Sequence, residues 1–378
     1  MLKRFFMQIN DSSWAAHVKK LMLTALAGLL LCCFDGVGVE MKLAGQIGGG
    51  TYALTFQDDH VFLGVGPRVF ILDVSDPNNP TLIGKTGILP SIVKDIVVVG
   101  NYAYIANDYG GLHIVDVSVP NQPYEIGSYV PSIEPIGPTP KFVDVAVVEN
   151  FVFIVDWGFG LRIIDVSNIS EPHEVGSFET GQARRVAVMG NYAFLVGHDF
   201  DLWIINISDP TNPFVVSSYD TAEHAWSIAV AGHYVYLGGW ETSLRIIDVS
   251  DPTRPYEVGS FDTRWGAHDL VVLGNYAYIS SDGLWIVDIS DPTNPVGKGF
   301  YYVQDVWSIA VEGDLAYITG ESGLRIIEVS DPSSPTEVGF YDVPGYINVV
   351  AIKDLIYMYS FRTVIAFIFL KFLLQTVL

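Results

Sequence analysis

The chain has 378 residues, and its 42 Asp and Glu outnumber its 20 Lys and Arg, for a formal net charge of −22. Such an acidic surface repels phosphate backbones, which excludes nucleic acid as an expected partner. Half of the residues are hydrophobic, enough for a large core. The two cysteines, Cys32 and Cys33, are adjacent and near the N-terminus, so neither a disulfide framework nor a cysteine-based metal site is expected.

Residues 1–38 are typical of an export signal. Lys19 and Lys20 supply positive charge, and the apolar run 21–31 that follows them is too short for a comfortable membrane span. Small residues before Val39 predict cleavage near that position, and hence an extracellular or cell-surface protein. An internal helix is one alternative. A lipoprotein signal, with Cys32 or Cys33 as the lipidated residue, is the other.

A phrase of the form DVSDPxxP recurs along the chain. It appears in seven copies, 40 to 49 residues apart, whose marker serines are Ser75, Ser118, Ser167, Ser208, Ser250, Ser290 and Ser330. A period of this length with only strand signals is typical of a four-stranded propeller blade. The expected fold is therefore an all-β propeller.

One copy, residues 267–303, illustrates the expected blade. Alternating and turn-bounded patterns predict strands at 267–273, 276–280, 284–290 and 296–301. The other copies divide in the same way. Each predicted third strand is followed by the repeated phrase, which we expect to form the turn into the outermost strand.

The polar residues of the phrase have a structural explanation. Pro252 fixes φ in the turn, Asp251 can cap backbone N–H groups, and the Ser250 hydroxyl can do the same. The acid before the serine is replaced by Asn206 in one copy and by Glu328 in another, which indicates hydrogen bonding rather than charge.

The strands "LHIVDVS", "LRIIDVS", "LWIVDIS" and "LRIIEVS", preceded by "NYAYI"-like strands and followed by "EVGSF"-like ones, resemble the LVIVD repeat family. The resemblance covers roughly residues 50 to 345 in seven copies that agree in motif and spacing. It implies an extracellular or surface-associated β-propeller, as found in bacteria and archaea. It implies nothing about chemistry, because that family is largely uncharacterised.

The two ends of the repeat region predict how the ring closes. Residues 41–50 resemble an outer strand, and residues 346–360 resemble the first two strands of a blade. We therefore expect an eighth blade shared between the termini, within a propeller that spans 39–360, and this removes an exposed sheet edge. Seven blades with leftover ends are the alternative.

The hydrophobic tail, residues 361–378, lacks the repeated phrase. We expect a strand followed by poorly packed chain. Arg362 and Lys371 interrupt the apolar run and argue against a membrane anchor. Foreign sequence from a damaged reading frame is a further alternative.

The residues that enter each innermost strand are expected to surround the central channel. The first strand residues are Ala53, Asp95, Asp144, Arg185, Ser227, Asp269, Ser308 and Asn348. They are preceded by Tyr52, Lys94, Val143, Arg184, Trp226, His268, Trp307 and Ile347. Carboxylates among the first set can bind Ca²⁺ or another divalent cation through oxygen ligands, and these are Asp95, Asp144 and Asp269. The alternative is that they cap strand ends and hold water.

Three connecting loops, 221–226, 263–269 and 301–307, are rich in aromatic residues. We expect them to bring a ligand-binding set to one face, where aromatic rings can stack on sugars or engage peptide side chains. The set comprises His224, Trp226, Arg264, Trp265, His268, Tyr302 and Trp307. The alternative is that these aromatics cover blade junctions.

Motifs of known catalytic chemistry are absent from the sequence: there is no nucleophile elbow, phosphate loop or HExxH. We therefore expect an exported, monomeric, non-enzymatic scaffold that binds a protein or a glycan, with membrane contact only through a lipid or tail anchor. The alternative is a hydrolase or lyase with a divalent cation in the channel, assisted by His268.

Overall fold

A computed structural model describes residues 41–43, 51–131, 139–197, 202–220, 224–239, 244–263, 265–304, 306–320, 323–343, 356–357 and 370–372. The chain divides into two compact units. The larger unit carries all seven copies of the repeated phrase, and the smaller unit contains short segments from both ends of the chain.

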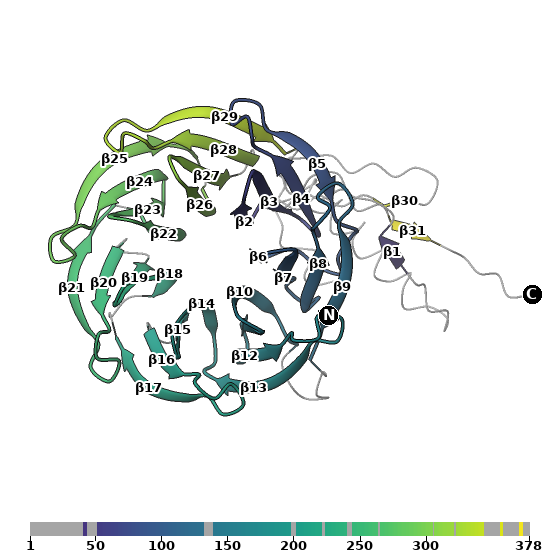
Figure 1. Ribbon diagram of the computed structural model, residues 1–378, viewed down its shortest axis with the longest axis horizontal. Coiled ribbons are helices and arrows are strands. Elements are labelled where there is room, and N and C mark those ends of the chain that lie inside the picture. The colour runs from purple at the N-terminus through teal and green to yellow at the C-terminus, as the bar shows by residue number, and fades with distance from the viewer. Residues whose placement is uncertain are drawn as a thin grey trace, which may run out of the picture. The chain divides into compact units, whose positions relative to one another are not determined.

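The larger unit consists of seven four-stranded antiparallel sheets, each built from four consecutive strands (Figure 1). The first three blades contain β2 (Ala53–Gln57), β3 (His60–Val65), β4 (Arg68–Asp73) and β5 (Thr81–Lys85); β6 (Asp95–Val99), β7 (Tyr102–Ala106), β8 (Leu112–Asp116) and β9 (Tyr124–Tyr129); and β10 (Phe142–Val148), β11 (Phe151–Asp156), β12 (Gly160–Asp165) and β13 (His173–Glu179).

The fourth and fifth blades contain β14 (Ala183–Met189), β15 (Tyr192–Gly197), β16 (Leu202–Asn206) and β17 (Phe214–Tyr219); and β18 (Ala225–Ala231), β19 (Tyr234–Gly239), β20 (Leu244–Asp248) and β21 (Tyr256–Phe261). The last two contain β22 (Asp269–Leu273), β23 (Tyr276–Ser280), β24 (Gly283–Asp288) and β25 (Val296–Tyr302); and β26 (Ser308–Glu312), β27 (Leu315–Gly320), β28 (Gly323–Glu328) and β29 (Thr336–Asp342). The strands predicted for residues 267–303 are confirmed to within two residues at either end.

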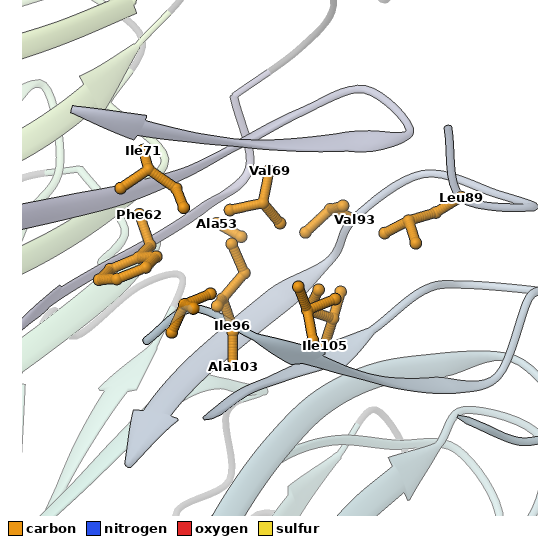
Figure 2. Close-up of a cluster of buried hydrophobic side chains, with 11 residues drawn as sticks. Ala53, Phe62, Val69, Ile71, Leu89, Val93, Ile96, Ala103 and Ile105 are labelled. Atoms are coloured by element: carbon orange, nitrogen blue, oxygen red, sulfur yellow. The ribbon is translucent and has the colours of Figure 1, made fainter. Parts of the chain in front are cut away.

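The blades are arranged radially around a central channel. Figure 1 shows the first strand of every blade, β2 to β26, nearest the centre and the fourth strand, β5 to β29, at the rim. Each pair of neighbouring blades shares one hydrophobic cluster. In the first junction, Figure 2 shows Phe62 and Ile71 of one blade facing Ile96 and Ile105 of the next. Burial between sheets, rather than strand pairing, therefore joins the blades.

The ring closes between the seventh and first blades. Their shared cluster contains Leu324 and Ile326 from β28 together with Leu54 and Val61 from β2 and β3. The Thr51 hydroxyl also donates a 2.8 Å hydrogen bond to the carbonyl of Gly320, across the same junction. The expectation of eight blades is therefore wrong, and the seven-blade alternative is correct. Both end blades draw all four strands from contiguous chain, so neither needs a strand from the other terminus.

The repeated phrase forms the turn between the third and fourth strands, as predicted. In the fifth blade, Asp248 Oδ1 accepts the Ser250 N–H at 2.8 Å, and Asp251 Oδ1 accepts both the N–H and the hydroxyl of Thr253 at 3.0 and 2.6 Å. Asn206 makes the same bonds to Ser208 in the fourth blade. The prediction that hydrogen bonding, not charge, selects the first acid is confirmed.

The fourth strand of each blade carries a β-bulge that the sequence analysis did not foresee. In the fifth blade, Ile246 pairs with Gly259 whereas Ile247 pairs with Glu257, so Val258 has no opposite residue. The same register shift occurs in the other six blades. A bulge strengthens the local twist, and in most blades a glycine follows it.

That glycine lies against the turn of the next blade. A Cβ built on Gly259 would lie 2.2 Å from the carbonyl oxygen of Pro292, closer than real Cβ contacts allow. The same approach recurs around the ring and includes Gly339 of the last blade against Pro77 of the first. In the fourth blade Ser217 takes this position, and its hydroxyl donates a 2.6 Å hydrogen bond to the carbonyl of Pro252. The rim is therefore continuous across the closing junction.

The smaller unit contains a three-stranded sheet in the order β1 (Met41–Leu43), β31 (Leu370–Phe372) and β30 (Ile356–Tyr357). A segment from before the repeats thus pairs with strands from after them. Residues 1–38 and the rest of 361–378 lie outside the described residues, so the export signal and the tail stay predictions. Within the described residues there is no helix with the length and hydropathy of a membrane span.

Candidate functional site

The mouth of the channel is formed where each chain segment enters its innermost strand. Three entering residues are held by the same bond, in which their backbone N–H donates to a carbonyl at or next to the end of the second strand. The pairs are Lys94 to Ala106 at 2.8 Å, His268 to Ser280 at 2.9 Å and Trp307 to Thr319 at 2.9 Å.

A cavity of about 270 Å³ lies between these entering residues. Every one of the seven blades contributes at least one side chain to its lining. The lining residues are Tyr52, Lys94, Lys141, Val143, Trp157, Arg184, Arg185, Trp226, His268 and Trp307. The prediction that residues preceding the inner strands converge at the channel is confirmed for seven blades, and Ile347 lies outside the described residues.

The aromatic side chains of the lining follow one another around the cavity. Trp226 and His268 have ring centroids 5.8 Å apart, His268 and Trp307 are 5.2 Å apart, and Trp307 meets Tyr52 edge-on at 6.0 Å. Tilted and edge-on pairs of this kind are attractive beyond their buried area. Aromatic and imidazole rings from four of the seven blades thus form a continuous wall along one side of the cavity.

Cationic side chains line the cavity on either side of this wall. The Lys94 ammonium lies 4.8 Å from the centroid of the Tyr52 ring, and the Arg184 guanidinium lies 4.9 Å from Trp157 and 5.0 Å from Trp226. Lys141 lies 5.7 Å from the Trp157 ring. Cation–π contacts hold a charge over a ring without neutralising it.

Three of the four cations in the lining make no ion pair within 4.0 Å in the described part of the chain: Lys94, Lys141 and Arg184. Burial lowers the pKa of Lys94, and Lys141 and Arg185 lower it further, although Asp108 acts in the opposite direction. Burial, followed by the charge of Arg185, lowers the pKa of the Arg184 guanidinium. The cavity therefore gathers cations inside an acidic protein, with Asp108 interacting electrostatically with Lys94 and Lys141.

One residue further into the inner strands lie the three predicted carboxylates. Each accepts a backbone N–H from the inner strand of the next blade. Asp95 accepts from Val145 at 3.0 Å, Asp144 from Val186 at 2.7 Å and Asp269 from Ile309 at 3.1 Å. These side chains therefore tie neighbouring blades together.

Arg185 provides the counter-charge for this carboxylate set. Its Nε lies 3.4 Å from Asp144 Oδ1, and the charges of Asp144, Asp269 and Asp95 raise the pKa of the guanidinium against the effect of burial. Burial raises the pKa of all three carboxyl groups, and that of Asp144 furthest, where Asp95 and Asp269 add to the effect. Three acids thus share one permanent cation.

Among the described residues, no group of three or more His, Cys, Asp or Glu side chains is arranged to hold a metal ion. Cation binding at Asp95, Asp144 and Asp269 stays a prediction, and so does the hydrolase or lyase that depends on it.

The predicted ligand-binding set divides between two locations. Trp226, His268 and Trp307 line the cavity. Trp265 and Tyr302, with exposed fractions of 65% and 66%, lie outside the lining. His224 is also exposed, and Arg264 lies outside the described residues. Among the described residues of the aromatic loops, those that line the cavity are Trp226, at the start of β18, and His268 and Trp307, which directly precede β22 and β26.

Two lining residues were missed by the sequence analysis. Trp157 lies between the second and third strands of the third blade, and its N–H donates a 2.8 Å hydrogen bond to the carbonyl of Lys141. Lys141 lies two residues before the expected position, Val143, beside a register shift between Phe142 and Asp144. Tyr52, Lys94, Arg184 and Arg185 stood at the predicted positions. The signal overlooked was that the cations gather in the second to fourth blades and the rings of Trp226, His268, Trp307 and Tyr52 in the remaining blades.

The sequence model described as the LVIVD repeat matches residues 57–86, 91–130, 141–180, 180–221, 222–263, 266–303 and 304–343. The seven matches correspond to the seven blades. Among curated proteins, none matches the chain.

Solved structures share the fold at low sequence identity. The computationally designed Ika8 protein aligns with a TM-score of 0.59 and 12% identity over 88% of this chain and 100% of its own. PorZ, a surface component of the type-IX secretion system of Porphyromonas gingivalis, aligns with 0.58 and 14% over 81% of this chain and 39% of its own. A putative 6-phosphogluconolactonase from Bacteroides uniformis aligns with 0.59 and 12% over 67% and 86%. These similarities concern the fold alone.

Proposed function

Because this chain belongs to the LVIVD repeat family and its repeats build all seven blades, we propose that it is an exported, non-enzymatic scaffold that binds a protein or a glycan at the mouth of its channel. The observation that carries the proposal is the cavity of about 270 Å³ to which every blade contributes a side chain. Ligand sites in proteins are usually concave and lined by aromatic side chains together with a few polar groups.

The chemistry of the lining supports recognition. Four aromatic or imidazole rings in succession offer flat faces, and four cations offer charge and hydrogen-bond donors. Trp, Tyr and Arg are the residue types that dominate binding energy in interfaces. His268 has a tryptophan ring on either side of it, an arrangement that suits stacking.

Export rests on residues 1–38, where positive charge precedes an 11-residue apolar run. A fusion of residues 1–38 to a reporter enzyme tests it, because export delivers activity outside the cytoplasm. A reporter that stays inside the cell contradicts this part of the proposal.

Binding is tested by screening the full chain on glycan and peptide arrays and then measuring the hits by calorimetry. Trp226→Ala removes a lining ring, and the expected result is a loss of affinity of about tenfold or more, the usual size of a hot-spot effect. Trp265→Ala is the matched control, because Trp265 is 65% exposed and outside the lining. An equal loss in both variants, or the absence of any ligand at micromolar concentration, contradicts the proposal.

A further inference from the structure

The cavity has a charge opposite to that of the protein around it. The chain carries a net charge of −22, whereas the ten lining residues include Lys94, Lys141, Arg184 and Arg185 and no carboxylate. A cleft lined by one sign of charge concentrates ions of the other sign. Arg185 is paired with Asp144, so the other three lining cations, Lys94, Lys141 and Arg184, are those that favour an anion.

The cations of the cavity are already placed for such an anion. The Arg184 guanidinium contacts two rings, at 4.9 Å from the centroid of Trp157 and 5.0 Å from that of Trp226, and these contacts restrict its position. Its Nε is buried and has no hydrogen-bond partner among the described residues. A guanidinium presents N–H donors at its edge in a fork that matches a carboxylate. A buried donor without a partner is costly, and an anion at this position would satisfy it.

The aromatic wall on the other side of the cavity requires an apolar face on the same ligand. Trp226, His268, Trp307 and Tyr52 form a continuous set of ring contacts, and Trp307 keeps 37% of its surface exposed. The face of an aromatic ring is the negative side of its quadrupole and attracts the weakly positive C–H groups of a saturated ring. Inorganic phosphate or a small carboxylate alone would leave this wall uncovered.

The size of the cavity limits the occupant. Its volume of about 270 Å³ is slightly below the range of roughly 300–1,000 Å³ for pockets that take drug-sized ligands. It therefore suits one ring with its substituents, either as a free molecule or as the last unit of a chain, and not an extended segment lying across the face.

We propose that the cavity binds a sugar acid, a pyranose ring bearing a carboxylate, either free or as the terminal unit of an acidic glycan. Arg184, Lys94 and Lys141 take the carboxylate, and the Trp226–His268–Trp307–Tyr52 wall takes the C–H face of the ring. This inference rests on the proposed binding function and names its ligand class.

The test compares glucuronate and galacturonate with glucose and galactose by calorimetry on the full chain at low salt, together with an oligouronate and an acidic peptide. The acidic sugars should bind at least about tenfold more tightly than the neutral sugars. Added salt should weaken the binding of the acidic sugars. Arg184→Gln keeps much of the side-chain length and removes the charge, and should cost about tenfold in uronate affinity. Lys94→Gln is a second variant that does not depend on Arg184.

Arg254→Gln is the matched control, because Arg254 is an exposed residue in the turn after β20 and its loss changes the net charge equally. Comparing the affinities for the oligouronate and for the monomeric uronates shows whether the cavity takes the end of a chain or a free acid. Equal affinity for neutral and acidic sugars, or capture of the acidic peptide in place of uronate, overturns the sugar-acid inference and leaves the binding scaffold intact. Equal losses of uronate affinity in Arg184→Gln and Arg254→Gln overturn the assignment of the binding site to the cavity. Failure of every probe counts against both proposals.

Discussion

Replacing Gly339 with alanine perturbs the junction at which the ring closes. A Cβ on Gly339 would lie 1.8 Å from the carbonyl oxygen of Pro77, whereas ordinary contact begins near 3.4 Å. The seventh and first blades would therefore have to separate locally by more than 1 Å, or the bulged strand β29 would have to shift. The three atoms nearest to this Cβ, the carbonyl oxygen and carbon of Pro77 and the Cα of Asn78, all belong to the backbone, so the strain falls on backbone.

The expected cost follows from the behaviour of overpacked sites, which lose about 1–3 kcal/mol of unfolding free energy. For the roughly 290 residues from Thr51 to Val343, an unfolding entropy of roughly 2.1 cal/mol/K per residue converts this cost into a decrease in Tm of about 2–5 °C. Gly259→Ala, at an interior junction with the same geometry, should produce a similar decrease.

Differential scanning calorimetry measures the effect, and Gly87→Ala is the control. Gly87 has no atom within 4 Å of a built Cβ and an ordinary φ, so alanine there should leave Tm unchanged or slightly higher. If Gly339→Ala matches Gly87→Ala while Gly259→Ala is destabilised, then Gly339 does not contact the first blade. The seven-blade closure would then be refuted.

Two further predictions concern the carboxylates of the channel. Because burial raises the pKa of Asp144 in the folded protein, its contribution to stability is fully present below its unfolded pKa of about 3.8 and declines as pH rises toward the folded value. Asp144→Asn should therefore match the wild type near pH 3.5 and exceed it near pH 7.5 in urea unfolding, and the reverse order would contradict the inference. Since burial raises the pKa of the three carboxyl groups and each already accepts a backbone N–H, added Ca²⁺ or a chelator should shift Tm by less than about 1 °C. A larger, saturable increase with Ca²⁺ would support the divalent-cation alternative.

The architecture of a single blade was predictable because its causes are local. The alternation in residues 267–303, the turn chemistry of Asp251 and Pro252, and the exchange of Asp for Asn206 all act over a few residues. The lining of the cavity was half predictable for the same reason: one position before each inner strand faces the channel, and Trp226, His268 and Trp307 occupy it.

Other features required the assembled ring. Trp157 and Lys141 reach the cavity from a loop and from beside a register shift, where a fixed position in the repeat no longer predicts direction. Dividing the chain length by the repeat period predicted eight blades. The number of blades is instead set by the angle between neighbouring sheets, which depends on how seven hydrophobic clusters and the glycine contacts at the rim pack.

The sequence by itself thus determined what each blade is and which residue of each blade enters the channel, because hydrogen bonding and side-chain alternation along one strand act at short range. Only the tertiary structure decided how many blades close the ring, and that the Arg184 guanidinium contacts the rings of both Trp157 and Trp226. Those outcomes depend on contacts between residues tens to hundreds of positions apart, and the geometry of these contacts is set by packing around the whole circle.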